Sequence, residues 1–155
     1  MTFINFIYLS TIVIWIGMIF FTTFFAAPSI FKVLPRESAG EVMGSIFPKY
    51  WIVGYASSVI ALACTLIISK ALGFYPAERL IILIIMTALS FFSGLVIGRR
   101  ARNIKAEMKR AENPEDKARF RKAFGKVHAV SAVINLTILF LGFILIYIMA
   151  RSGGF

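Results

Sequence analysis

Hydrophobic residues run through this chain in four long stretches that contain no charged side chain. The stretches are Met1–Phe31, Tyr50–Ser69, Leu80–Gly98 and Val127–Ala150. A helix rises about 1.5 Å per residue, so roughly 20 apolar residues cross the ~30 Å hydrocarbon layer of a bilayer. A chain of 155 residues cannot hide four such helices in a water-soluble core. The pattern therefore predicts a polytopic membrane protein.

The uninterrupted runs indicate helices, because strands of a membrane barrel are about 10 residues long and alternate in polarity. We expect an all-α fold, a four transmembrane helix bundle that forms a single membrane domain over residues 1–155. The spans are predicted at about residues 3–31, 49–71, 78–100 and 123–150. The first run lacks the positive start of a signal peptide, so we interpret it as a retained span.

Two polar segments between the spans also have a helical pattern. The segment from Pro35 to Ser45 predicts a short cytoplasmic interfacial helix, with Met43 and the apolar residues after it on the membrane surface. Between spans three and four, Asn113-Pro114 should break the helix, and Glu115-Asp116 should open the next one. These signals predict a basic cytoplasmic helical hairpin.

The distribution of charge predicts the orientation. The net charge is +10, and 14 of the 17 Lys and Arg residues lie in the first and third connections, which share one side of the membrane. The positive-inside rule places that side in the cytoplasm and both termini outside, as in a bacterial-type plasma (inner) membrane. The lipid bilayer itself and anionic lipid headgroups at the cytoplasmic face are the expected partners, and nucleic acid is not.

Polar residues inside the spans are candidates for a binding site, because such groups are costly in lipid and usually face the bundle interior. Most of them fall in the cytoplasmic half, so we expect a polar pocket there. Its predicted lining is Thr22, Tyr55, Ser90, Ser93, His128, Ser131 and Asn135. The alternative is that the Ser and Thr side chains only join helices through interhelical hydrogen bonds.

Two further groups suggest metal or cofactor chemistry. His128 is the one histidine in the chain, and it could accept a proton, line the pocket or serve as an axial ligand to haem. Met18, Cys64 and Met86 fall near the centre of the bilayer, and their sulfur atoms suit a soft metal ion. The alternative for these three is ordinary apolar packing. No arrangement typical of a catalytic site is present, so we expect no enzyme activity.

Several local patterns, in order along nearly the whole chain, resemble the transmembrane protein 205-like family, four-span membrane proteins of unknown function. They are Trp15-x-Gly17, Pro28-x-x-Phe31, Pro35-Arg36, Phe47-Pro48-x-Tyr50, Asn103, and His128 with Ser131 and Asn135. Gly98-Arg99-Arg100 departs from the pattern, because bacterial relatives often have a proline there. An animal member is associated with resistance to a platinum drug, so the resemblance implies a transporter linked to metal resistance.

Three functions remain open on these grounds. The leading hypothesis is an integral membrane protein that binds or transports a small solute or soft metal species through the polar pocket, with a homo-oligomer as the expected assembly. The second is a haem-binding or redox-linked membrane protein that uses His128. The third is a non-catalytic accessory or scaffold protein whose basic hairpin contacts lipid or a partner.

Overall fold

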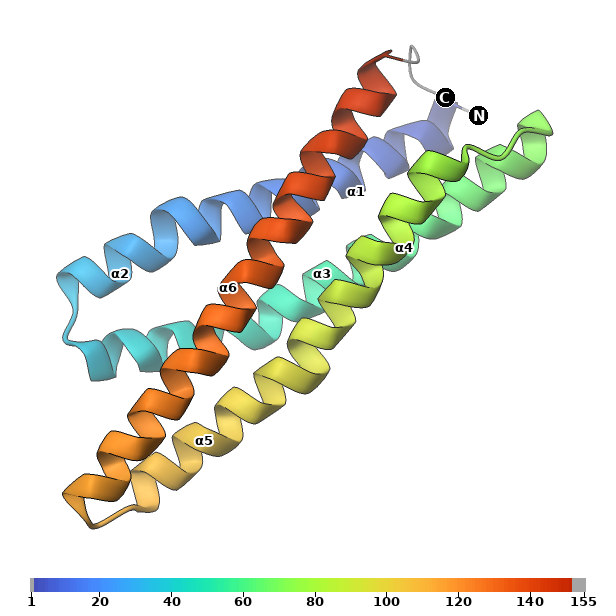
Figure 1. Ribbon diagram of the computed structural model, residues 1–155. Helices are drawn as coiled ribbons and strands as arrows, with labels where there is room; N and C mark the ends of the chain where they lie inside the picture. The colour runs from blue at the N-terminus through green and yellow to red at the C-terminus, as the bar shows by residue number, and fades with distance from the viewer. Residues whose placement is uncertain (1, 152–155) are drawn as a thin grey trace.

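The computed structural model describes residues 2–151, and helices account for nearly all of them (Figure 1). The first long helix is composed of α1 (Thr2–Phe21), a π-helical turn η1 (Thr22–Ala26) and α2 (Ala27–Val33). The second is α3 (Arg36–Leu72), and the third joins α4 (Ala77–Phe92), a π-helical turn η2 (Ser93–Ile97) and α5 (Gly98–Arg110). The last is α6 (Pro114–Arg151).

All four long helices have the length and composition needed to cross a membrane, which confirms the predicted all-α bundle. Successive helices run antiparallel, so the N-terminus of α1 and the C-terminus of α6 lie at the same end of the bundle (Figure 1). We call this the terminal end. The opposite end carries the α2–α3 and α5–α6 connections, and we call it the hairpin end.

Local sequence signals explain the connections. The Asn113 side-chain oxygen accepts a hydrogen bond of 3.0 Å from the backbone N–H of Glu115, which caps α6, and Pro114 takes the first helical position. The helical hairpin at Asn113-Pro114 is therefore confirmed. At the terminal end, Gly73 closes α3 with a φ of 66°, a left-handed conformation that glycine adopts without steric strain.

The segment after Pro35 differs from the expectation. It does not form a separate interfacial helix but is the first part of α3, which runs through Pro48 without interruption. Ala39 and Met43 are buried within the protein instead of facing lipid. The Nζ atom of Lys105 in α5 donates a 3.1 Å hydrogen bond to the backbone oxygen of Gly40. Packing and this hydrogen bond explain why the segment stands beside α5 and continues the direction of the span.

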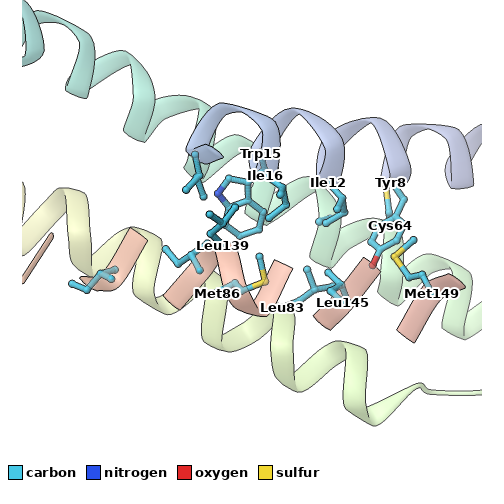
Figure 2. Close-up of a cluster of buried hydrophobic side chains, with 14 of the residues drawn as sticks. Tyr8, Ile12, Trp15, Ile16, Cys64, Leu83, Met86, Leu139, Leu145 and Met149 are labelled. Atoms are coloured by element: carbon cyan, nitrogen blue, oxygen red, sulfur yellow. The ribbon is translucent and has the colours of Figure 1, made fainter. Parts of the chain in front are cut away.

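The core is an apolar cluster to which all four long helices contribute (Figure 2). Trp15, Ile16, Met86 and Leu139 meet in one part of it, and all four are almost completely buried. Large apolar side chains such as Phe140 remain exposed on the outside. An apolar exterior fits a bundle whose surrounding solvent is lipid.

Helix α6 approaches α1 closely at Gly142. A Cβ atom built on Gly142 would collide with the Ile16 side chain, which is buried and belongs to the core. Gly17, on the exposed side of α1, has no atom within 4 Å of the corresponding position. The first glycine is required for packing, and the second is not.

We therefore expect Gly142→Ala to destabilise the protein by about 1–3 kcal/mol, the usual cost of overpacking a core. Gly17→Ala, the matched control, should not lower stability, because the added methyl group meets open space. Thermal unfolding of both variants in the same detergent measures the difference. Equal unfolding temperatures would contradict the proposed close contact.

Candidate functional site

A small internal cavity lies where all four long helices meet. It is lined by residues of α1, α3, α4, η2 and α6: Trp15, Ile19, Tyr50, Trp51, Gly54, Tyr55, Ser90, Ser93, Asn135 and Ile138. The volume open to the centre of a water molecule is about 10 Å³. Such a space accommodates about one water.

The lining combines aromatic walls with a few polar groups. Trp15 is almost fully buried, and its indole nitrogen lies 3.7 Å from the point where a Cβ atom of Gly54 would be. The Tyr55 ring stacks on Phe91, with 4.4 Å between the ring centroids. Apolar walls with a small number of placed polar groups are typical of small-molecule sites.

Two of the polar groups have no hydrogen-bond partner within the described part of the chain. They are the hydroxyl of Tyr50 and the hydroxyl of Ser93, and both residues are more than nine-tenths buried. A buried hydroxyl without a partner is unfavourable by roughly 1–3 kcal/mol. Both residues line the cavity. A ligand in the cavity that donates and accepts hydrogen bonds would relieve this cost.

The structure brings together four of the seven residues predicted for the pocket. Tyr55, Ser90, Ser93 and Asn135 line the cavity, and they come from α3, α4, η2 and α6. Their convergence depends on helix rotation, which the sequence alone could not provide.

The other three predicted pocket residues are not part of the lining. Thr22 lies half-buried in η1, and Ser131 lies half-buried in α6. His128 is exposed, and its ring stacks on that of Phe124 one turn earlier, with 6.4 Å between centroids. His128 shares a face of α6 with Asn135 but lies about 10 Å closer to the hairpin end, so it does not reach the cavity.

The three sulfur-containing residues lie in different surroundings. Cys64 and Met86 are buried, and Met18 is half-buried beside the core. Figure 2 shows Cys64 with Tyr8 and Met149 at one end of the cluster, whereas Met86 lies further along it. Among residues 2–151 there is no group of three His, Cys, Asp or Glu side chains that could hold a metal ion.

The aromatic walls other than Tyr55, and a buried cation, were not predicted from the sequence. Trp15 and Tyr50 appeared in it only as parts of the family pattern, although a tryptophan or tyrosine within a span is a signal for a polar partner. Arg79 lies in the first turn of α4, near the terminal end, and is only 5% exposed. It acts electrostatically on Tyr8, which also interacts with the Thr65 side chain. An arginine at the start of a span is itself a signal for such a cluster.

The wall formed by Trp51 is held on several sides. The indole stacks on the Phe47 ring, with 5.6 Å between the ring centroids. The guanidinium of Arg102, a residue of α5, lies 5.4 Å from the centroid of the indole. A Cβ atom on Gly98 would collide with the far edge of the indole, and one on Gly94 would collide with the Tyr55 hydroxyl. Two glycines after Ser93 therefore let α3 place both rings against η2 and α5.

Gly98→Ala should displace the Trp51 ring and destabilise the protein by about 1–3 kcal/mol, because the ring is fixed by Phe47 and Arg102. Gly125→Ala is the matched control, since no atom lies within 4 Å of its added methyl group. Tryptophan fluorescence and thermal unfolding should change in the first variant only. An unchanged emission spectrum in Gly98→Ala would refute this packing.

Comparison with known proteins assigns the chain to a family whose function is not defined. A protein of Aquifex aeolicus (strain VF5), described as "Uncharacterized protein", is 32% identical over 139 residues, which cover 88% of this chain and 91% of the relative. No solved structure matches. Residues 10–110 match the family described as "Domain of unknown function (DUF4149)". The chain is therefore a four-helix integral membrane protein that belongs to the DUF4149 family.

Proposed function

We propose that this membrane protein binds a small uncharged polar solute in the cavity between its four helices and passes it across the bilayer. The single observation that carries the proposal is that two residues lining one cavity, Tyr50 and Ser93, have buried hydroxyls without a hydrogen-bond partner among residues 2–151. Asn135 adds an amide that both donates and accepts hydrogen bonds. The solute is uncharged because no carboxylate, amine, guanidinium or imidazole lines the cavity to pair with a charge.

Entry of a solute larger than water requires the walls to move. Trp51 and Tyr55 both line the cavity, and their side chains lie against Gly98 of α5 and Gly94 of η2. π-helical turns are frequent at functional sites, and η2 begins at the cavity residue Ser93. Outward displacement of the Trp51 ring is the proposed opening step. The positive-inside rule supports a cytoplasmic location for the hairpin end, so this opening would face the cytoplasm.

A soft metal species is the second solute class. The resemblance to the transmembrane protein 205-like family supports it, as does the presence of Cys64 and Met149 at one end of the core (Figure 2). The pair Cys64 and Met149 is not the set predicted from the sequence, which was Met18, Cys64 and Met86. Figure 2 shows Met86 away from Cys64. Silver(I) is a suitable probe, because thiol and thioether ligands favour soft cations.

Solute flux tests the proposal directly. Purified protein is reconstituted into liposomes, and glycerol or urea entry is followed by light scattering after an osmotic step. We expect flux above that of protein-free liposomes. Tyr50→Phe and Ser93→Ala should each lower it about 2–10-fold, because each removes one hydrogen bond worth about 0.5–1.5 kcal/mol.

His128→Ala is the matched control, because the side chain is exposed and does not line the cavity. It should leave glycerol and urea flux unchanged. Silver(I) binding by the same preparation, with and without Cys64→Ser, separates the soft-metal alternative. Flux equal to that of empty liposomes for both solutes would reject transport of this solute class.

A further inference from the structure

A second, larger depression lies at the hairpin end, between the N-terminal part of α3 and α5. It is lined by Glu41, Gly44, Arg102, Lys105, Ala106 and Lys109, and its volume is about 420 Å³. The depression is shallow and open to the surroundings. We call it the cationic groove. It is separate from the internal cavity, and the two have no lining residue in common.

We infer that the cationic groove binds the phosphate of an anionic membrane lipid. Arg102, Lys105 and Lys109 follow one another at positions i, i+3 and i+7, so they share one face of α5. The one acidic residue in the lining is Glu41. The groove therefore has an excess of two positive charges.

Contacts with α3 hold each of the three cations in place. The Arg102 guanidinium lies over the Trp51 ring, and Lys105 donates a hydrogen bond to the Gly40 backbone oxygen. Lys109 forms a 3.0 Å ion pair with Glu41. Cations that are already positioned lose less conformational entropy when a ligand binds.

The ion pair between Lys109 and Glu41 determines which cations of the groove remain available to contact a phosphate. The hydrogen bond and charge of Lys109 hold the pKa of Glu41 below its usual value, so this carboxylate is ionised at neutral pH and neutralises Lys109. Lys105 uses one of its three N–H groups on Gly40. Arg102 and the remaining donors of Lys105 are the groups that would contact a phosphate.

The position of the groove along the third long helix indicates a lipid. This helix begins at Ala77, and roughly 20 residues cross the hydrocarbon layer. At about 1.5 Å per residue, Arg102 then lies within about 10 Å of the hydrocarbon edge, at the depth of the headgroup phosphates. The apolar Trp51 ring beneath Arg102 extends toward the span. A lipid can thus reach the groove laterally from its own leaflet.

Native mass spectrometry of the full chain in detergent tests the inference. The probes are phosphatidylglycerol, phosphatidylcholine and water-soluble glycerol phosphate. We expect phosphatidylglycerol to bind more tightly than phosphatidylcholine. Arg102→Gln and Lys105→Gln should each weaken its binding about fivefold, which corresponds to ~1 kcal/mol for one cation near an anionic lipid.

Two further variants show whether a change in lipid binding comes from the groove itself, from the general positive charge of the protein or from misfolding. Arg119→Gln is the matched control, because Arg119 also lies over an aromatic ring, that of Phe120, but outside the groove. It should leave binding unchanged. Glu41→Gln should strengthen phosphatidylglycerol binding, because it removes the competing carboxylate and frees Lys109.

Three results would overturn the inference. The first is equal binding of phosphatidylglycerol and phosphatidylcholine. The second is a loss in Arg119→Gln as large as that in Arg102→Gln, which would indicate a diffuse charge effect. The third is binding of glycerol phosphate as tight as that of phosphatidylglycerol, which would assign the groove to a soluble phosphate compound.

Discussion

Close packing of helices in lipid depends on small residues, since the surrounding hydrocarbon is as apolar as the helices themselves. This chain meets the constraint by placing bulky side chains against glycines of a neighbouring helix. Trp15 packs against Gly54, Trp51 against Gly98, and Ile16 against Gly142. These contacts join α1 to α3, α3 to α5, and α6 to α1. The cavity and the aromatic rings around it exist because the helices approach one another at these points.

Trp51 connects the two sites at the hairpin end. One side of its ring belongs to the wall of the internal cavity, and the Arg102 guanidinium of the cationic groove lies over the same ring. Because Gly98 leaves no space behind the indole, a shift of Arg102 would be transmitted to the ring. The two sites are thus in mechanical contact although they have no lining residue in common.

The fold was largely predictable from the sequence, because charge-free runs of this length have few other physical solutions. The break at Asn113-Pro114 was also readable, since a capping side chain and a proline act locally. The course of residues 36–47 could not be predicted from the sequence. Its amphipathic pattern suits either a membrane surface or a protein surface, and the contact of Lys105 with Gly40, 65 residues away, decides between them.

The site was predictable only in part, for a similar reason. Depth along a span can be estimated from residue number, and the estimate put Tyr55, Ser93 and Asn135, which line one cavity, in the same half of the membrane. The estimate was too coarse for His128, which shares a face of α6 with Asn135 but lies about 10 Å closer to the hairpin end and is exposed. Trp15 and Tyr50 were not predicted for the site, because the sequence presented them only as parts of the family pattern and not as hydrogen-bonding groups within a span.

The shared location of the chain ends has a practical consequence for topology mapping. Because α1 starts and α6 finishes at one end of the bundle, reporters fused to either tail must give the same compartment. A cysteine label introduced at the Asn113 bend must give the other. Three such probes over-determine the insertion before any functional assay is interpreted. Disagreement between the tails would indicate a different number of crossings, and signals from both compartments at every probe would indicate a mixed orientation.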